Sequence, residues 1–425
     1  MTDKKMILGI GLTSGYGMLP GSWRAPGVDP ENYARVEANV RYAQAAERGG
    51  FSFVFTPDFP ILRGGEDRGG IQNIMEPMLH LAAIAQATRR IGLVATGSTS
   101  FQEPFNTARQ FKALDVMSRG RVGWNAVTTS DPAVAANYGM PVAERTVRYQ
   151  RAHETIQIVQ ALWGSWRRDA WIKDAETGRY LDPDKLQPVN LRGKHVGSRG
   201  PLPIPPSEQG QPVIFSSGAP SPHMLALAGR YASGFIAEVW TIEEGRAQRE
   251  MLRNAVAPTV REGLDRRIAL SDGAIEARLP ALGAMLGLRL DPARIDVPLT
   301  PEDLAKARVA SGDPRAGIAL EVARQGWSPR DVLAHGVIDY HPVAVGPPEV
   351  HADHLQRWFE AGAADGFWIL PDVFEDGVDA FVDQVVPLLR DRGLYPQDYI
   401  GATLRENLGV PDQYGPDPRL AAATR

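Results

Sequence analysis

Short apolar runs alternate with amphipathic stretches along most of this chain. The runs are rich in β-branched and aromatic residues and lack polar alternation, which is typical of strands buried on both faces of a parallel sheet. The expected strands, of which the seventh is weak, are Met6–Ile10, Phe51–Thr56, Ile91–Thr96, Val122–Thr128, Val213–Ser216, Phe235–Trp240, Ile268–Leu270 and Phe367–Leu370. Eight such strands with helices between them predict an α/β fold, a closed (β/α)8 or TIM barrel, with an open doubly wound sheet as the alternative.

The stretches between these runs repeat their apolar residues at steps of three and four, as one face of a helix requires. The expected helices are Pro30–Gly50, Glu76–Thr88, Thr107–Ser118, Arg145–Trp163, Met224–Arg230, Pro301–Ala310 and Arg315–Gln325. Gly49 and Gly50 mark the end of the first helix, because glycine commonly ends helices. Arg89 and Arg90 follow the second helix, where positive charge is favourable.

Long segments rich in Gly, Pro and charged residues interrupt this pattern. Two of them, Gly15–Pro30 and Arg63–Gly70, follow the first two strands and therefore belong to the carboxyl-terminal face of a barrel. We expect the whole chain, residues 1–425, to be a single barrel domain. Insertions at about 166–212 and 291–341 are expected over the carboxyl-terminal face, and a C-terminal tail at about 396–425.

Composition removes several classes of function. Of the 425 residues, 43% are hydrophobic and 23% charged, and the formal net charge is -4, so no basic field is available to bind nucleic acid or an anionic membrane surface. The chain contains no cysteine, which excludes disulfides, thiolate nucleophiles and cysteine-ligated metals. The N-terminus lacks the apolar core of a signal peptide, and no run of 18 apolar residues occurs. We therefore expect a cytoplasmic protein with no nucleic-acid, membrane or metal partner.

One polar residue stands in the middle of the fourth apolar run. Asn125 lies within Val122–Thr128, and a buried amide needs partners for up to four hydrogen bonds. It is therefore either satisfied by the backbone or directed at a ligand. The hydroxyl cluster Thr128–Ser130 follows at the strand end, where a parallel barrel places its chemistry.

Several motifs occur in the order in which one known family carries them. They are Trp23–Pro26, Phe55–Asp58, Ala95–Arg109, Gly123–Ser130, Arg148-Tyr149, Val345–Glu349, Ala361–Phe367 and Thr403–Gly409. Over nearly the whole chain they are similar to the bacterial-luciferase-like flavin-dependent monooxygenases, in particular to the nitrilotriacetate monooxygenase and dibenzothiophene-sulfone monooxygenase group.

This resemblance implies a TIM barrel that acts as a two-component FMNH2-dependent monooxygenase. A separate NAD(P)H:flavin reductase supplies reduced FMN, O2 is the co-substrate, and a peroxyflavin oxygenates a small organic substrate by C–N or C–S cleavage or oxygen insertion. The resemblance also implies a homodimer or a dimer of dimers. Two alternatives stay open, namely an F420-dependent hydride-transfer oxidoreductase of the same superfamily and a non-catalytic flavin-binding protein with a degenerate barrel.

The resemblance also points to site residues at the ends of the strands. It implies that Asp58, Thr96 and Asn125 contact the flavin or the oxygen site, and that Asn125 and His341 are catalytic. Each also has an ordinary structural explanation: a turn or helix cap for Asp58, strand propensity for Thr96, and a backbone hydrogen bond for His341.

Four further residues are implied in cofactor binding. Arg145 and Tyr149 lie four apart, so they share one helix face and can reach FMN together, although a solvated surface pair is the alternative. Family members commonly carry histidine at the position of Arg145, and the fixed cation favours phosphate or carboxylate binding. Gly218 and Ser221 belong to a loop that matches the family's FMN-phosphate loop, where a plain turn is the alternative.

The chain departs from the family pattern at the seventh strand. Relatives have an apolar strand there, whereas Val260–Gly273 offers few apolar residues. We expect either a short strand at Arg267–Ser271 or a distorted barrel, because the backbone groups of the neighbouring strands need partners.

Overall fold

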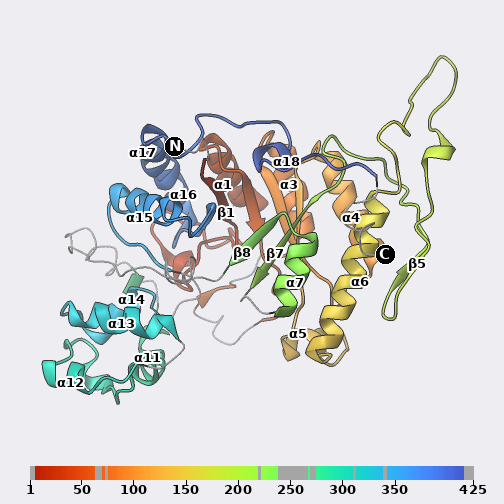
Figure 1. The fold of residues 1–425 in the computed structure, drawn as a ribbon. Helices are drawn as coiled ribbons and strands as arrows, with labels where there is room; N and C mark the ends of the chain where they lie inside the picture. Colours follow the sequence, from red (N-terminus) through yellow and green to blue (C-terminus); the bar gives the residue numbers. More distant parts are fainter. Residues whose placement is uncertain are drawn as a thin grey trace.

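A parallel sheet forms the centre of the protein (Figure 1). The computed structural model describes residues 5–62, 69–71, 75–218, 222–237, 267–268, 274–309, 313–337 and 342–415. In this part of the chain the sheet has seven strands in the order β8-β7-β4-β3-β2-β1-β9, and neighbouring strands pair in parallel. The strands are β1 Ile7–Gly11, β2 Phe53–Thr56, β3 Gly92–Ser98, β4 Val122–Val127, β7 Val213–Gly218, β8 Gly234–Ala237 and β9 Gly366–Ile369.

Contacts across the sheet show that it curls into a barrel. The rings of Phe53 in β2 and Phe215 in β7 are 5.3 Å apart, although β3 and β4 lie between these strands in the sheet. Ile236 of β8 and Trp368 of β9 belong to the same apolar cluster, although their strands are the two edges. A flat sheet would keep these side chains far apart. The barrel fold expected from the sequence is confirmed.

The main difference between the predicted and the observed fold concerns the seventh strand. Arg267 and Ile268 are helical, and the remaining residues of that predicted strand, 269–271, lie outside the described residues, as do residues 238–240 of the predicted sixth strand. The Arg267 guanidinium donates to the Ala334 carbonyl at 2.9 Å and pairs with Asp372, while Ile268 packs against a separate helical cluster. These contacts hold Arg267 and Ile268 outside the pattern of sheet pairing.

Helices surround the barrel (Figure 1). Those that follow its strands are α1 Val36–Arg48, α3 Pro77–Ala87, α4 Pro104–Met117, α5 Pro132–Asn137, α6 Arg145–Trp163, α7 Pro222–Tyr231, α15 Pro348–Glu360, α16 Phe374–Ala380 and α17 Val386–Asp391, with a π-helical turn, η4 Phe381–Val385, between the last two. The prediction for α6 is confirmed at both ends. The prediction for α1 began too early, because Asp29 accepts from the Glu31 N–H and holds the preceding residues in turns.

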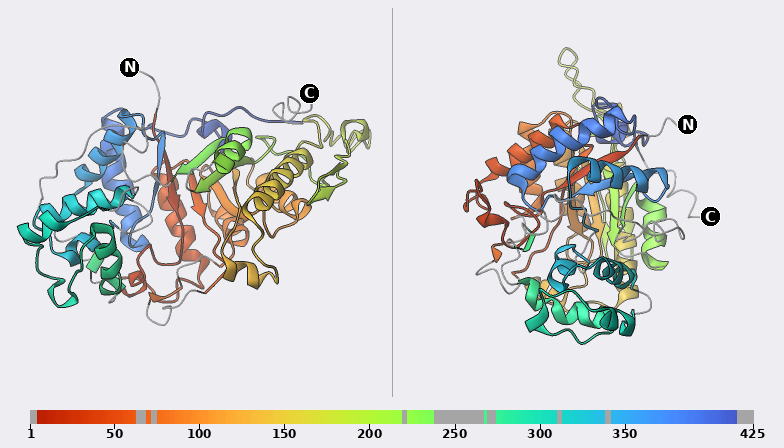
Figure 2. Two further views of the ribbon diagram at one scale, coloured as in Figure 1. Left: turned by 60° about the horizontal axis from the view of Figure 1, so that its bottom comes forward. Right: turned by 90° about the vertical axis from the view of Figure 1, so that its left-hand side faces the viewer.

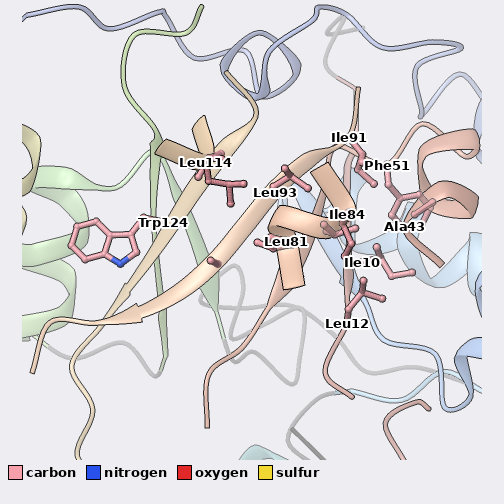
Figure 3. Close-up of a cluster of buried hydrophobic side chains, with 14 of the residues drawn as sticks. Ile10, Leu12, Ala43, Phe51, Leu81, Ile84, Ile91, Leu93, Leu114 and Trp124 are labelled. Carbon is pink, nitrogen blue, oxygen red and sulfur yellow. The ribbon is translucent and has the colours of Figure 1, made fainter. Parts of the chain in front are cut away.

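The main core lies between the strands and these helices. Figure 3 shows Leu93 and Trp124 of β3 and β4 together with Leu81, Ile84 and Leu114 of the covering helices. The Trp124 indole donates to the Gly97 carbonyl at 3.1 Å, which satisfies its polar atom inside the core. Since side chains alternate along a strand, the outward position of Trp124 directs Asn125 into the barrel.

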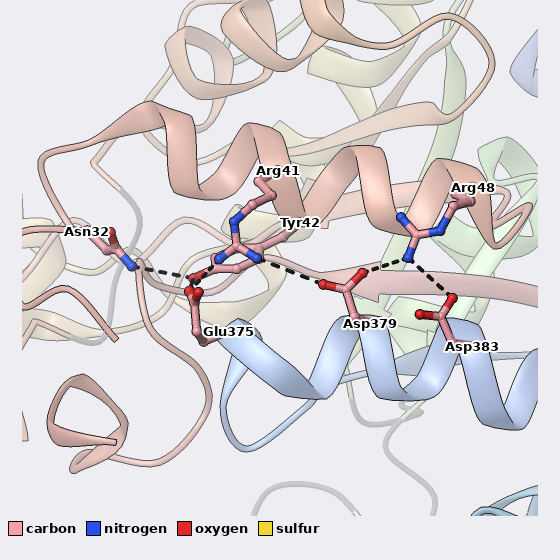
Figure 4. Close-up of polar contacts among 7 residues, drawn as sticks. All are labelled: Asn32, Arg41, Tyr42, Arg48, Glu375, Asp379 and Asp383. Carbon is pink, nitrogen blue, oxygen red and sulfur yellow. Dashed lines mark hydrogen bonds and ion pairs between the residues drawn. The ribbon is translucent and has the colours of Figure 1, made fainter. Parts of the chain in front are cut away.

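Ion pairs join the first helix to a late one (Figure 4). Arg41 of α1 pairs with Glu375 of α16, and Arg48 of α1 pairs with Asp379 at 2.6 Å. Such exposed pairs contribute little individually. Their network fixes the contact between two helices that lie far apart in the sequence.

The expected insertions take two different places. Residues 274–337 contain α10 Ala274–Ala277, α11 Leu279–Leu286, η3 Pro292–Arg294, α12 Pro301–Lys306, α13 Pro314–Arg324 and α14 Pro329–Ala334. These helices bury their own apolar cluster at one end of the molecule (Figure 2). The predicted helix at 301–310 is shorter than expected, whereas the one at 315–325 is confirmed within one residue.

Residues 166–212 do not cover the carboxyl-terminal face, so that prediction is wrong. The segment contains η2 Pro183–Lys185 and the hairpin β5 Leu191–Arg192 and β6 Gly197–Ser198. It runs along α6, where Glu154 accepts from the Lys194 N–H at 2.9 Å, and Gln209 reaches the Val122 carbonyl at the start of β4. The reason is topological: the segment leaves the end of a helix, which returns the chain to the amino ends of the strands.

The short helices η1 Ser22–Arg24 and α18 Leu404–Asn407 complete the described elements. α18 lies in the C-terminal tail, and its Leu404 N–H donates to the Gly120 carbonyl at 3.1 Å. Leu404 is fully buried in the apolar cluster of the barrel interior, which closes the amino end of the barrel. Within the described residues, no helix is both long and apolar enough to cross a membrane.

Candidate functional site

A buried polar pair lies inside the barrel. Thr96 in β3 and Asn125 in β4 are neighbours across the ladder, and the Asn125 Nδ2 donates to the Thr96 Oγ1 at 3.0 Å. Asn125 is only 2% exposed, and its Oδ1 has no hydrogen-bond partner among the described residues. Because an unpaired buried polar atom is costly, this carbonyl is poised to accept a hydrogen bond from a bound molecule.

Asp58 lies near this pair, just beyond the end of β2. It lines a small cavity that Thr96, Ser98, Thr129 and Tyr138 also line. Burial, and then the Glu76 carboxylate, raise the pKa of Asp58 from 3.8 to about 6. The carboxyl group therefore changes charge close to neutral pH, at the face where a barrel carries its chemistry.

The raised pKa of Asp58 predicts a pH-dependent stability. The folded state holds the proton more tightly than the unfolded state, so this group lowers stability as pH rises from 3.8 to about 6. The wild type should therefore lose stability between pH 4 and pH 7 that Asp58→Asn keeps. Over this range the difference in free energy of unfolding should grow in favour of the variant by on the order of 1 kcal/mol, since the carboxyl is partly solvated. Denaturant titration at several pH values measures this difference, and a constant or narrowing difference would contradict the assignment.

The helices α6 and α7 bring other predicted residues to the end of β7. The Tyr149 ring of α6 lies 5.3 Å from the His223 ring, in the first turn of α7. Arg145 stands one turn earlier on α6 and is exposed. Gly218 is the last residue of β7. Tyr149 therefore lies beside the first turn of α7, shortly after the connection for which the family resemblance predicts a phosphate site.

Two predicted residues cannot be placed. His341 and Ser221 lie outside the described residues. The sequence also pointed to the hydroxyl cluster at the end of β4, and Thr129 from it does line the cavity, where its Oγ1 lies 2.8 Å from the Ser98 Oγ. Tyr138 was missed, because a single tyrosine after a short helix gives no periodic or motif signal.

A larger cavity, of about 1140 Å³, lies between the edge strands β8 and β9. Phe215, Ile236, Trp368 and Leu19 are among the residues that line it, but Asp58, Thr96 and Asn125 are not. Within the described residues, no group of three or more metal-ligating side chains is assembled. Asp58, Thr96 and Asn125 therefore lie toward the ends of β2, β3 and β4 and not in the larger cavity, which Arg267, His351 and Asp372 help to line.

Comparisons with known proteins give a consistent result. Residues 18–365 match the model of the luciferase-like monooxygenase family. The chain is 32% identical to nitrilotriacetate monooxygenase component A of Aminobacter aminovorans, over 96% of this chain and 97% of that protein. It is also 32% identical to dibenzothiophene-sulfone monooxygenase of Rhodococcus erythropolis, over 87% of this chain and 88% of that protein.

A solved structure resembles the whole chain. It is that of a riboflavin lyase with modified FMN and its substrate riboflavin, and it superposes with a TM-score of 0.73 at 28% identity, covering 98% of this chain and 99% of that one.

Proposed function

The chain belongs to the luciferase-like monooxygenase family, and from this premise we propose that it is the oxygenating component of a two-component system. It is a flavin-dependent monooxygenase whose cofactor is reduced FMN and whose co-substrate is O2. In the proposal, a separate NAD(P)H:flavin reductase supplies the reduced FMN, and a small organic substrate is oxygenated through a peroxyflavin, with C–N or C–S cleavage or oxygen insertion. The name of the Aminobacter relative, a component A, supports the separate reductase.

The observation that carries the proposal is the buried side-chain carbonyl of Asn125, which has no hydrogen-bond partner among the described residues. Flavin presents ring N–H groups, and a buried Oδ1 without a partner among the described residues can accept from one of them. The bond from the Asn125 Nδ2 to Thr96 keeps the amide in one orientation. Asp58 would lie near the ring. When bound, the flavin supplies the redox chemistry, and these residues would position it and exclude water.

The phosphate end of FMN is proposed to lie where β7 meets α7. Gly218 allows close backbone approach there, and Ser221 would supply a hydroxyl. Arg145 and Tyr149 would reach the same end of the cofactor from α6, since Tyr149 already contacts the first turn of α7. His341 is proposed as the general acid or base. A cytoplasmic homodimer built from single-domain chains completes the proposal.

The proposal predicts a defined spectroscopic result. Purified protein mixed with FMNH2 under air should form a long-lived peroxyflavin, which stopped-flow absorbance detects as an intermediate that persists before oxidised FMN appears. Protein heated beyond unfolding, with the same flavin and oxygen, is the control and should show only immediate oxidation. Tight FMN binding without this species would instead favour a non-catalytic flavin-binding protein.

A further inference from the structure

An aromatic wall lies beside the polar cavity. We define it as Phe59, Phe101 and Tyr138, which come from the connections after β2, β3 and β4. The rings of Phe101 and Tyr138 are stacked, with centroids 4.7 Å apart and planes 9° from parallel. Phe59 and Tyr138 are 46% and 42% exposed, so ring surface remains available to a bound molecule. Flat aromatic surface of this kind binds other rings by stacking.

The connections that carry the wall are held together. Asn137 at the end of α5 donates from its Nδ2 to the Pro60 carbonyl at 2.8 Å, which joins the connection after β4 to the one after β2. Phe101 and Tyr138 themselves line the cavity with Asp58 and Thr96. Phe101 and Tyr138 therefore form one surface next to the proposed flavin position, and the bond to Pro60 holds the connection that carries Phe59 beside it.

Among the described residues, the carboxylates of Asp58 and Glu76 act on the cavity beside this wall, whereas the Arg151 guanidinium, which donates to the Thr99 carbonyl, is paired with Glu103 at 3.3 Å. Glu76 caps the start of α3, where its carboxylate accepts from the Leu79 N–H at 2.7 Å. The pKa of Tyr138 is raised by burial and then by Asp58 and Glu76, so both carboxylates act on the cavity. A carboxylate brought into this position would be repelled by them. An uncharged ring would not.

We propose that the substrate of this chain presents an uncharged aromatic ring to the wall of Phe59, Phe101 and Tyr138, and that polycarboxylates are excluded. The inference rests on the proposed function, because it names the substrate class of the same site. Likeness alone does not select this class, since among the relatives one is named for a tricarboxylate and another for an aromatic sulfone. The stacked rings of Phe101 and Tyr138 and the carboxylates of Asp58 and Glu76 favour an uncharged aromatic substrate.

Equilibrium binding to the FMN-loaded protein at pH 7.5 tests the proposal, with dibenzothiophene sulfone and nitrilotriacetate as probes. We expect the sulfone to bind at least tenfold more tightly. Tyr138→Leu should weaken sulfone binding by about tenfold, and Tyr138→Phe should retain it, because the ring and not the hydroxyl makes the contact. Tyr180→Ala, which removes a tyrosine that is 63% exposed on the 166–212 segment, is the matched control and should change nothing.

A second variant tests the exclusion of carboxylates. Glu76→Gln, whose amide oxygen can still cap α3, should raise the affinity for nitrilotriacetate about tenfold and leave sulfone affinity unchanged, since only a charge is removed. Tighter binding of nitrilotriacetate than of sulfone by the wild type, or unchanged sulfone binding in Tyr138→Leu, would overturn the proposal. An FMN titration done first separates the proposed function from the proposed substrate class. Failure to bind FMN would contradict the proposed function. The same probe titrations in flavin-free protein would still test the aromatic wall.

Discussion

Asn125→Ala is expected to slow the reaction of bound reduced FMN with O2 by about a hundredfold while the protein stays folded. The amide oxygen is buried in the barrel interior and has no partner among the described residues, and the proposed function gives it the cofactor as its partner. The only hydrogen bond that the described structure gives this side chain is the one to Thr96, and its loss costs about 1 kcal/mol. Stopped-flow absorbance measures the flavin reaction, and denaturant unfolding measures the stability.

Asn39→Ala is the matched control for this prediction. Asn39 is another amide that is 1% exposed, but it lies on α1 and faces the helical layer outside the barrel. Its removal should leave the flavin reaction unchanged. Thr96→Val, which keeps the shape but frees the Asn125 amide, should give an intermediate loss. If Asn125→Ala instead unfolds and its residual folded fraction reacts normally, the amide has only a structural role.

The barrel and most of its strands could be predicted because strands buried on both faces leave continuous apolar runs. Val122–Thr128 is such a run, and β4 occupies Val122–Val127. The same pattern shows the polar exception at Asn125, and the pairing of Thr96 with Asn125 follows once β3 and β4 are neighbours in register. These features depend on local sequence and on parallel order, which periodicity reports well.

Other features depend on tertiary contacts that leave no local signal. The path of residues 166–212 is set by contacts such as that between Lys194 and Glu154, which are 40 residues apart. Arg267 is helical and anchored to Asp372, although its neighbours suggested a strand. Tyr138 reaches the cavity only because α5 folds back toward Pro60. Sequence spacing does not report such distances, so these parts could not be predicted.

Arg121→Ala is expected to lower the free energy of unfolding by about 4 kcal/mol. Arg121 is 3% exposed, and its guanidinium donates to the carbonyls of Ala85 and Thr88 at 3.0 and 3.2 Å, at the end of α3. It also donates to the carbonyls of Ile91 and Ser118 at 2.7 and 2.8 Å. One side chain thus satisfies buried acceptors at the end of α3, before β3 and after α4, and alanine would leave them unpaired.

The geometry of the donor matters as much as its charge. Arg121→Lys keeps the positive charge near the negative end of α3 but has one nitrogen in place of the planar fork, so it should recover less than half of the loss. Arg89→Ala removes an exposed arginine beside the same helix end and should change stability by no more than about 0.5 kcal/mol. Denaturant unfolding followed by tryptophan fluorescence compares the three variants. Equal stability of Arg121→Ala and Arg89→Ala would contradict the prediction. It would mean that the carbonyls bound by Arg121 find other partners, such as water, at no cost in free energy.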